Sequence, residues 1–500
     1  MKPTAFIAGS AQLSRRPDVG SPWRRDEPAT LVTESARRAL ADTGIKTIAS
    51  RVDAIACAES FAWSYVDLCS RVAQGIGCTQ ELRQFWVPSG GNSPQDLLHD
   101  MCSAVAAGEI HCAVLAGAEA LYSRNRAYRE SEHLDWSERP AATDPFRGQK
   151  PFSSALEQRH GLGLPTQAFP LFENAIRAAN GRSANEQSAR AARLLAKNAR
   201  VAADNPYAWF RDAPSAHDIA TVTPENRLIC YPYTKRMNAI MNVDQSAAIV
   251  IISEKLMQEL GIESRCAAVL GGAGAQDAWF VSERESLDAS PAMQVAMAAA
   301  LNHAGLDAAK IDAFDFYSCF PSAIEFALSA LNIEDDDDRP FSLTGGLAFA
   351  GGPGNAYVLH SLAAAASRLR EGNARTALVT GLGMACAKHA ATVLARTDTI
   401  PPDASGQTPK RVEHTAIACD TVDVAEGDGK VVSYTIDYRR DGSPQQALYV
   451  LDLVDGRRTM ANSAVPVEQA ATELLAIEPV GRTGTITHDT EHGTNRFAFH

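Results

Sequence analysis

The stretch SGGNSPQDLLH at residues 89–99 and the stretch AGGPGNAYVLH at residues 350–360 share one design. In each, two adjacent glycines precede an apolar segment that ends in Leu-His. This pattern predicts a tight turn that opens a buried helix, and the free N–H groups at a helix N-terminus attract carboxylates, phosphates or developing oxyanions. Two such turns in one chain predict two half-sites that face a single pocket.

The two turns belong to a longer internal repeat, because further features recur in the same order about 260 positions apart. The matched segments are ALADTGI (39–45) and ALNHAGL (300–306), RVDAI (51–55) and KIDAF (310–314), and CAVLAG (112–117) and TALVTG (376–381). Helices that alternate with short, continuous apolar runs indicate a buried and largely parallel sheet in each half. Ligands of such sheets bind beyond the carboxyl ends of the strands, where the glycine turns stand.

Two regions depart from the repeat, and 500 residues are enough for two or three domains. Residues 123–240 are rich in charge, Pro and Trp, which predicts an inserted cap or substrate-handling domain with one long helix around 183–203. After the linker PPDASG at 401–406, apolar alternation and hairpin turns predict a small β-barrel of OB type. The predicted domains are 1–122 (first half), 123–240 (insertion), 241–265 (return to the first half), 266–400 (second half) and 410–500 (β-barrel).

Composition narrows the classes of partner. The net charge of −12 and the absence of a basic run argue against nucleic acid, and no segment is long and apolar enough to predict an integral membrane protein. The 10 cysteines show no CxxC spacing, which predicts buried thiols, a cytoplasmic protein and no metal site. The N-terminal apolar run is too short for a signal peptide. The acidic run at 335–338 is expected to be a solvated loop.

Several segments resemble the thiolase superfamily. AGEIHCAVLAGAE at 107–119 is similar to its "GxxDvvlAGGxE" strand, and NVDQSAA at 242–248 is similar to its "DGAAA" motif. Other segments resemble the thiolase-like protein type 1 relatives of the sterol carrier protein thiolases, a group of acetyl-CoA acetyltransferase type. These segments are FPLFENA (169–175), NPYAW (205–209), YPYTKRM (231–237), YSCFP (317–321) and KHA (388–390).

The resemblance implies an α/β protein with the thiolase fold. In that fold two duplicated βαβαβαββ halves form a layered αβαβα arrangement, with a loop domain inserted in the first half. In this subgroup an OB-like C-terminal β-barrel is added. The resemblance also implies an acyltransferase fold used in lipid or acyl-CoA metabolism.

The motifs depart from the thiolase pattern at the positions that carry its chemistry. Thiolases need a cysteine nucleophile, a histidine that activates it, a second acid/base and oxyanion holes. In register, Gly91 stands at the nucleophile position and Gly352 at the position of the "GHP" histidine. The chain has Tyr317 where "HDCF" or "NEAF" begins, and the "CxG" region around Gly381 and Gly383 has no cysteine in register. The resemblance therefore implies that ordinary thiolase activity is missing.

Five side chains remain as candidate catalytic groups: Tyr317, Cys319, Cys386, Lys388 and His389. Cys319 is either a buried structural thiol or a reactive thiol with His389 as its base. Tyr317 is either a packed aromatic or a donor to a thioester carbonyl, and the Cys386–His389 segment is either structural or part of the site. Structural roles are expected for the remaining polar groups of the glycine turns: helix capping for Ser89, Asn92 and Ser93, and a shared role for His99 and His360.

The resemblance implies a CoA or acyl-CoA ligand rather than a tightly bound cofactor. Lys235 and Arg236 could meet its phosphates, and Tyr233 could pack on pantetheine or adenine, although ordinary surface residues would look the same. The complete set of candidate binding residues is Ser89, Gly90, Asn92, Tyr233, Lys235, Arg236, Gly351, Gly381 and Gly383. A monomer and a homodimer are both compatible with the sequence.

Three functions stay open at this point. The first is an acyl-CoA-dependent acyltransferase or C–C lyase with rewired residues, including a retro-aldol lyase that uses Tyr317 and Tyr357 and has its OB-type partner fused as the C-terminal barrel. The second is a non-catalytic acyl-CoA or lipid carrier, favoured by the glycines at 91 and 352. The third and weakest is a structural subunit of a larger complex.

Overall fold

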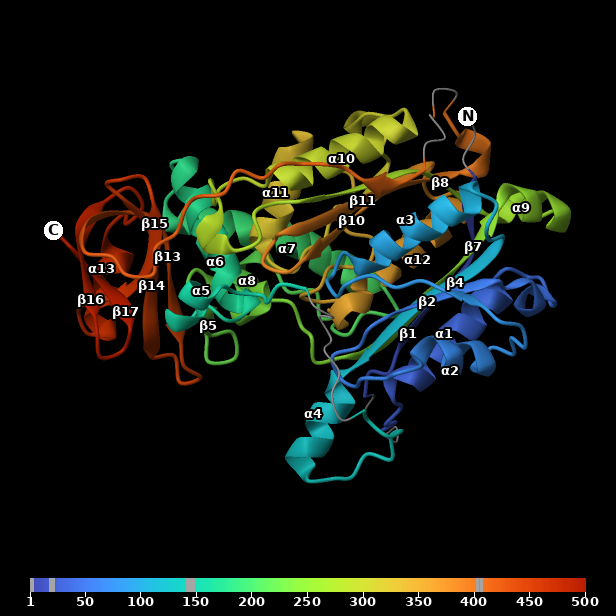
Figure 1. Ribbon diagram of the computed structural model, residues 1–500, viewed down its shortest axis with the longest axis horizontal. Coiled ribbons are helices and arrows are strands. Elements are labelled where there is room, and N and C mark those ends of the chain that lie inside the picture. Colours follow the sequence, from blue (N-terminus) through green and yellow to red (C-terminus); the bar gives the residue numbers. More distant parts are fainter. Residues whose placement is uncertain (1–3, 18–22, 141–148, 402–403, 405–407) are drawn as a thin grey trace.

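The computed structural model describes residues 4–17, 23–140, 149–401, 404 and 408–500. A layered core of helices and strands occupies one side of the molecule, and a β-barrel built from the C-terminal residues occupies the other (Figure 1). The predicted linker at 401–406 lies largely outside the described residues. Among the described helices, none is long and apolar enough to cross a bilayer.

The first half of the core contributes five neighbouring strands to the sheet. Their order is β3 (Arg83–Gln84), β2 (Ala54–Ala58), β4 (Cys112–Ala120), β7 (Asp244–Ser253) and β1 (Ala5–Ser14). β7 runs antiparallel to both of its neighbours, whereas β3, β2 and β4 are parallel. β4 and β7 are buried along their whole length, as the continuous apolar runs predict.

The second half repeats this order in reverse, which confirms the duplication. β8 (Ala267–Gln276) is followed by β11 (Lys388–Arg396), β10 (Thr376–Gly383) and β9 (Ala313–Asp315). The place of the outermost strand is taken by residues 340–341, whose carbonyl groups accept hydrogen bonds from the N–H groups of Phe314 and Phe316. β1 and β8 pair where Phe6 meets Ala268, so the two halves form one continuous sheet, to which β12 (Lys410–Arg411) adds through β8.

The helices complete the layers predicted for a thiolase fold (Figure 1). α1 (Pro28–Asp42) and α2 (Leu68–Gly75) cover the first half, and α10 (Pro291–Ala304) and α11 (Pro321–Leu331) cover the second. α3 (Ser93–Ala106) and α12 (Tyr357–Arg370) lie between the halves and contact strands of both. These two central helices are the ones that the glycine turns open.

The two helix histidines have matching roles, as the sequence predicts. The imidazole of His99 in α3 hydrogen-bonds Thr392 in the second half at 2.9 Å, and the imidazole of His360 in α12 hydrogen-bonds Gln12 in the first half at 3.0 Å. Burial lowers the pKa of both side chains to about 3. Each histidine is therefore a neutral group that joins its helix to the opposite half.

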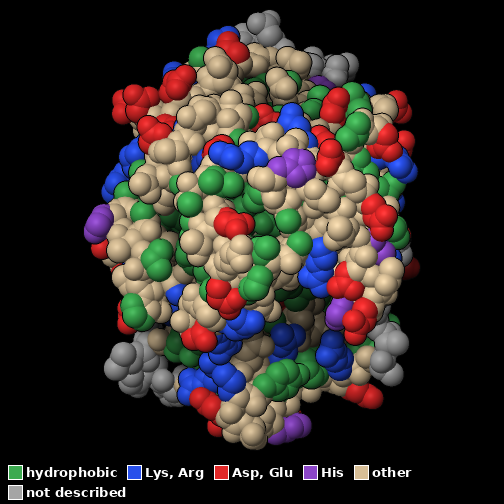
Figure 2. Space-filling view, turned by 90° about the vertical axis from the view of Figure 1, so that its left-hand side faces the viewer, with side chains coloured by type: hydrophobic (Ala, Val, Ile, Leu, Met, Phe, Trp, Pro, Cys, Tyr) green, Lys and Arg blue, Asp and Glu red, His purple; other side chains and the backbone are tan. Residues whose placement is uncertain are grey.

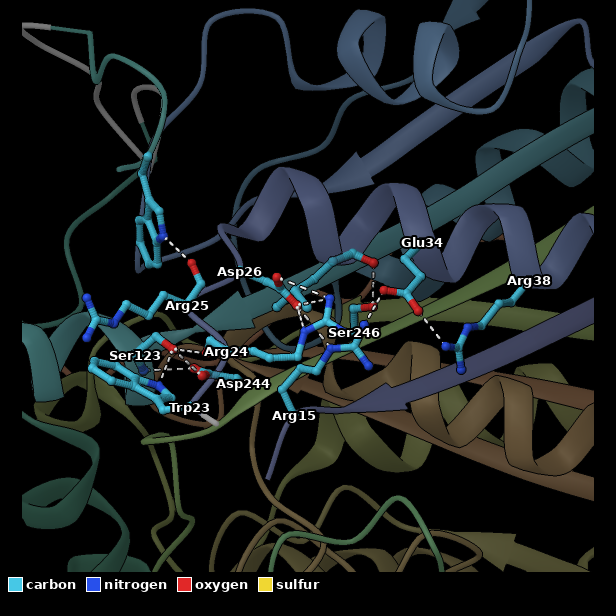
Figure 3. A network of polar contacts seen from close by, with 12 residues as sticks. Arg15, Trp23, Arg24, Arg25, Asp26, Glu34, Arg38, Ser123, Asp244 and Ser246 are labelled. Atoms are coloured by element: carbon cyan, nitrogen blue, oxygen red, sulfur yellow. Dashed lines mark hydrogen bonds and ion pairs between the residues drawn. The ribbon is translucent and has the colours of Figure 1, made fainter. Parts of the chain in front are cut away.

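The inserted region begins at a network of polar contacts beside β1 and β7 (Figure 3). The carboxylate of Asp244 accepts hydrogen bonds from the N–H and the hydroxyl of Ser123, at 3.0 and 2.6 Å. The indole N–H of Trp23 donates to the Ser123 hydroxyl at 3.1 Å, and the Arg15 guanidinium donates to Asp26 at 3.1 Å. These bonds fix the start of α4 (Leu121–Glu130) against the core.

The insertion then forms α5 (Ala155–Arg159), α6 (Pro165–Ala179), α7 (Ala184–Asp204), α8 (Ala216–Ala220), β5 (Leu228–Cys230) and β6 (Tyr233–Thr234). α7 is the predicted long helix, and it begins with a capping box between Ser183 and Glu186. The 3-10 turn Lys235–Met237 leads the chain back toward β7.

The C-terminal region is a closed five-stranded barrel with OB-type connectivity, which confirms the predicted fold. Its strands are β13 (Gly427–Tyr438), β14 (Pro444–Leu453), β15 (Arg458–Ser463), β16 (Thr483–Asp489) and β17 (Thr494–Phe499), with α13 (Val467–Ala476) between β15 and β16. β13 pairs with both β14 and β16, and β15 runs parallel to β17. Acidic and basic side chains are interspersed on the face of the molecule that Figure 2 shows.

The barrel is firmly docked on the insertion. The Ser433 hydroxyl donates to the Leu171 carbonyl at 2.6 Å, and the Asn174 amide donates to the Tyr434 carbonyl at 2.9 Å. β5 extends the barrel by pairing with β13. α6 therefore has the barrel on one side and α11 of the core on the other.

Candidate functional site

The two glycine turns meet, as the paired motifs predict. The N–H of Gly90 in the first turn donates to the side-chain oxygen of Asn355 in the second turn at 3.0 Å. The side-chain nitrogen of Asn355 donates to the Glu59 carbonyl at 3.0 Å. One asparagine side chain thus ties the second turn both to the first turn and to the chain that follows β2.

Space at Gly91 is taken by Tyr317. A Cβ atom built on Gly91 would lie closer than 3.0 Å to the Tyr317 hydroxyl and to the Leu382 carbonyl oxygen. The second of these atoms belongs to the backbone and cannot rotate away. The tyrosine hydroxyl therefore lies where the side chain of a residue at position 91 would begin.

Space at Gly352 is more open. The nearest atom to a Cβ built there is a methyl carbon of Leu347 at 3.3 Å, and the next is the Ile240 carbonyl oxygen at 3.5 Å. The neighbouring Gly351 has φ +105°, and a Cβ there would overlap the amide of Gln245. The second turn thus requires glycine at 351 by its backbone, whereas 352 is limited only by a flexible side chain.

Tyr317 is fixed by a hydrogen bond of its backbone and by the packing of its ring on a second tyrosine. Its N–H donates to the Thr380 hydroxyl at 2.8 Å. Its ring makes an edge-to-face contact with Tyr357, with 5.5 Å between centroids. Burial, and to a lesser extent the neighbouring Cys319 thiol, raise the pKa of Tyr317 far above its usual value. The phenol is therefore neutral and can donate a hydrogen bond.

The hydroxyl of Tyr357 is held by a hydrogen-bonded network. Its hydroxyl hydrogen-bonds the Thr344 hydroxyl at 2.7 Å. Thr344 belongs to a buried network around Asp315, whose carboxylate also accepts from the Ser361 hydroxyl at 2.6 Å. Tyr357 therefore belongs to this buried hydrogen-bonded network, and its ring packs against the ring of Tyr317.

Of the two alternatives for Cys319, the contacts of His389 favour the buried structural thiol over a reactive thiol paired with His389. The Nε2 atom of His389 faces the Cys386 carbonyl at 2.9 Å, the Ser290 hydroxyl at 3.1 Å and the Asp277 carboxylate at 3.2 Å. Alternation along β11 turns this imidazole away from the face that bears Lys388, which a sequence motif does not reveal. His389 is therefore committed to Asp277.

The Cys319 thiol is a poor nucleophile because of its environment. Cys319 and Cys386 are buried. Burial, reinforced by the nearby Cys386, raises the pKa of the Cys319 thiol well above its usual range. Burial alone would lower the pKa of His389, but hydrogen bonds to the side chains of Asp277 and Cys386 raise it to about 9. A protonated imidazole does not remove a proton from a thiol.

Lys388 reaches the first glycine turn. Its ammonium donates to the carbonyl groups of Pro88 and Ser89, at 3.3 and 3.1 Å, and to the Gln149 side chain at 2.9 Å. Burial lowers the pKa of Lys388 to about 8, although Asp96 acts in the opposite direction. Lys388 thus supports the loop that carries Gly90 and Gly91. Sequence reasoning missed Gln149, Asn355 and Asp96, because single amides and carboxylates in these segments have no motif of their own.

Gly381 and Gly383 make room for side chains of α3. A Cβ on Gly383 would overlap the side-chain oxygen of Asn92, and a Cβ on Gly381 would overlap that of Gln95. Asn92 occupies the N-cap position of α3, but its side chain makes no capping hydrogen bond and donates instead to Asp96 at 2.7 Å. The predicted capping role of Asn92 is therefore wrong.

A cavity of about 210 Å³ is lined in part by Lys388. Its lining includes Asn92, Asp96, His99, Lys388 and Arg411. Burial raises the pKa of Asp96 to about 6, against the opposing effect of Lys388. This cavity adjoins the first turn.

The predicted CoA-binding residues divide into two groups. Tyr233 is fully buried, and its hydroxyl donates to Glu173 at 2.6 Å and contacts the Ser322 hydroxyl at 2.9 Å, so its predicted contact with a ligand is corrected to a core role. Lys235 is exposed, and Arg236 lies 3.6 Å from Asp212 near the surface. Of these three residues, Lys235 and Arg236 remain available to a ligand.

The segment after these cations enters the site. The N–H of Ala239 donates to the Cys319 carbonyl at 3.1 Å, and the N–H of Gly352 donates to the Ile240 carbonyl at 2.8 Å. The chain from Lys235 to Ile240 therefore connects the surface with the second glycine turn. Within the described residues, no group of three or more His, Cys, Asp or Glu side chains is arranged to hold a metal ion.

Comparison with known proteins supports the fold and the added barrel. Residues 409–491 match the family described as the thiolase-like protein type 1 additional C-terminal domain. A solved monomeric SCP2-thiolase-like protein type 1 from Mycobacterium smegmatis is 27% identical with a TM-score of 0.80, and the match covers 99% of each chain. No curated protein matches the sequence.

Two further solved structures share the fold at lower identity. The Ltp2-ChsH2(DUF35) aldolase is 18% identical with a TM-score of 0.59, and the match covers 80% of this chain and 100% of that chain. The human mitochondrial 3-ketoacyl-CoA thiolase in complex with CoA is 14% identical with a TM-score of 0.55, and the match covers 79% of this chain and 98% of that chain. These matches leave about a fifth of this chain uncovered, as expected for an added C-terminal domain.

Proposed function

We propose, from the premise that the chain is a thiolase-like protein with an added C-terminal domain, that it binds an acyl-CoA thioester without forming a cysteine acyl-enzyme. The observation that carries this proposal is the Tyr317 hydroxyl in the space beside Gly91. A nucleophilic side chain at position 91 would collide with this hydroxyl and with the Leu382 backbone. The raised pKa of the Cys319 thiol supports the same conclusion.

The proposed ligand would enter along residues 235–240. Lys235 and Arg236 at the surface would meet the phosphates, and the thioester would reach the two glycine turns. The protein would act in acyl-CoA or lipid metabolism, as a cytoplasmic monomer. The monomeric state of the Mycobacterium smegmatis relative supports the last point.

Calorimetry with CoA and with acyl-CoA of several chain lengths tests the proposal. Binding is expected to be tighter for the acyl-CoA than for free CoA, because the acyl chain adds buried apolar area. Intact-mass spectrometry of the same mixture is expected to show unmodified protein, and thiolysis of acetoacetyl-CoA by CoA is expected to be negligible. Acylated protein, or no binding at any chain length, would contradict the proposal.

A second candidate function is retro-aldol cleavage of a β-hydroxyacyl-CoA. It is favoured by the neutral Tyr317 phenol between the turns and by the shared fold of the Ltp2-ChsH2(DUF35) aldolase. In this reaction the Cα–Cβ bond breaks as the β-hydroxyl loses its proton, and the resulting enolate gains a proton at Cα. Tyr317 could take up the β-hydroxyl proton in the same step in which it passes its own proton to Cα, so the phenol would end unchanged.

Two matched variants distinguish cleavage from simple carriage. Tyr317→Phe should abolish release of aldehyde or ketone from a β-hydroxyacyl-CoA, by about 100-fold or more, while acyl-CoA affinity stays within about threefold. Tyr357→Phe should leave the chemical step largely intact, because its hydroxyl is bound to Thr344. A wild-type protein that binds acyl-CoA but never cleaves it would be a carrier.

A further inference from the structure

The hairpin loop at 384–387 has an unusual backbone that needs support. Met384 and Cys386 both have positive φ, 59° and 61°, which non-glycine residues rarely adopt. The loop joins β10 to β11 directly before Lys388 and His389. Its shape therefore sets the position of Lys388, and through it the first glycine turn.

The core holds this loop mainly by its carbonyl groups. The Ala385 carbonyl accepts from the Arg284 guanidinium at 2.8 Å, the Cys386 carbonyl hydrogen-bonds His389 at 2.9 Å, and the Ala387 carbonyl accepts from the N–H of Asp277 at 2.9 Å. Two of these three partners belong to the sheet or adjoin it: His389 lies in β11, and Asp277 directly follows β8. The third is Arg284, which lies in the loop after β8.

Arg284 is buried, and its guanidinium has few other partners. It lies 5.0 Å above the ring of Phe172 and 3.8 Å from the Asp277 carboxylate. Its Nε and Nη1 atoms have no hydrogen-bond partner in the described residues. Because this buried guanidinium has so few hydrogen bonds of its own, contacts to the backbone of Arg284 help to set its position.

The barrel supplies that support. The guanidinium of Arg458, in β15, hydrogen-bonds the Arg284 carbonyl, and its Nε donates to Asp452 at 2.7 Å. The N–H of Cys419, in the chain that leads to the barrel, donates to the Glu283 carbonyl at 2.7 Å. Arg458 is itself buried, so this contact is part of the packed interface between barrel and core.

We infer that Arg458 of the barrel positions the 384–387 loop through Arg284, so that the added domain shapes the proposed ligand site. Arg458 and Arg284 are positioning residues, and neither needs to touch a ligand. The functional meaning of this relay rests on the proposed function, but the relay itself does not. It gives the C-terminal barrel a role beyond covering α6.

Labelling of buried thiols in the native protein tests the relay, with peptide mapping to separate the cysteines. In the wild type, Cys386 should react as slowly as Cys112, since both are buried. In Arg458→Gln, Cys386 should react at least about tenfold faster while Cys112 is unchanged, because only the loop has lost support. Arg458→Lys should restore part of the protection, because its ammonium can still donate to the Arg284 carbonyl.

Ser433→Ala is the matched control, because it removes a different bond of the barrel, the one to Leu171 of the insertion. It should leave Cys386 protected. Equal acceleration in Ser433→Ala and Arg458→Gln, or unchanged labelling in a folded Arg458→Gln protein, would overturn the inference. If Arg458→Gln does not fold, Asp452→Asn weakens the anchor of Arg458 and should still accelerate Cys386 labelling, by a smaller factor; no acceleration there would also overturn it.

Acyl-CoA affinity of the same variants separates this inference from the proposed function. Lower affinity in Arg458→Gln, restored in Arg458→Lys, would support both. A wild-type protein that binds no acyl-CoA would contradict the proposed function while leaving the labelling result as the test of the relay.

Discussion

The two glycine turns look alike in sequence but differ in the space around them. At Gly91 the Tyr317 hydroxyl and a backbone oxygen fill the position of a side chain, whereas at Gly352 the nearest neighbour is a leucine methyl carbon at 3.3 Å, a tight contact that a flexible side chain can relieve. The first turn is also supported by Lys388 from the second half. Duplication has therefore preserved the backbone of the turns, while the side chains around them have made the first turn crowded and the second more open.

The comparison predicts its largest effect for alanine substitutions at these two positions. Gly91→Ala should destabilise the protein by about 3 kcal/mol or more, because the Leu382 carbonyl cannot move without disturbing β10. Gly352→Ala should change stability by less than about 1 kcal/mol, since only a leucine methyl has to adjust. Urea unfolding of both variants measures the difference. Similar losses at both positions would break the comparison.

The next effect concerns pH, because His389 adjoins the loop that supports the first turn. Its folded pKa of about 9 exceeds its usual value of 6.5, so protonation stabilises the folded protein. This stabilisation is fully present below pH 6.5 and is lost as the pH rises to about 9, up to about 3 kcal/mol in all. His389→Gln should lack this pH-dependent loss. Unfolding curves of both proteins between pH 6 and 9.5 measure the difference between their free energies of unfolding. The opposite pH dependence that Lys388 contributes is common to both proteins and cancels in this difference.

Asn355 tests whether the two turns depend on one another. Asn355→Ala should cost about 2 kcal/mol, because it leaves the buried N–H of Gly90 and the Glu59 carbonyl without this partner. Asn355→Asp keeps the acceptor for Gly90 and should bring back protection of that N–H. Hydrogen exchange at Gly90 reports the result. Unchanged exchange in Asn355→Ala would mean that the turns are held separately.

The smallest effect is expected at the entrance to the second turn. Lys235→Ala and Arg236→Ala should each weaken CoA binding by about fivefold, because exposed charges interact weakly with phosphates through water. The loss should shrink at high salt and for dephospho-CoA. Lys430→Ala, an exposed lysine on the barrel, is the control and should have no effect. Equal losses for all three variants would show that the phosphates bind elsewhere.

Much of the fold could be predicted from the sequence, because its helices and strands follow from local patterns that recur along the chain. The matched segments around 39–55 and 300–314 predict the two halves, and the alternation after residue 427 predicts the OB-type barrel. The shared role of His99 and His360 followed from their matching positions. Patterns of this kind depend only on near neighbours in the chain.

The details of the site could not be predicted in the same way. Whether His389 faces Cys319 or Asp277 depends on strand alternation and on a carboxylate more than a hundred residues away. Tyr233 looks like a surface aromatic beside two cations, yet Glu173 and Ser322 bind its hydroxyl in the core. That Tyr317 fills the space beside Gly91 follows only from three segments that meet in the fold.

The most direct test of the central claim is a crystal structure of the protein with a bound acyl-CoA that it cannot turn over. The thioester is predicted to lie between the two glycine turns, with its carbonyl oxygen within about 3.2 Å of the Tyr317 hydroxyl. A thioester sulfur placed against Cys319 or Cys386, or an acyl group bonded to either thiol, would contradict the account.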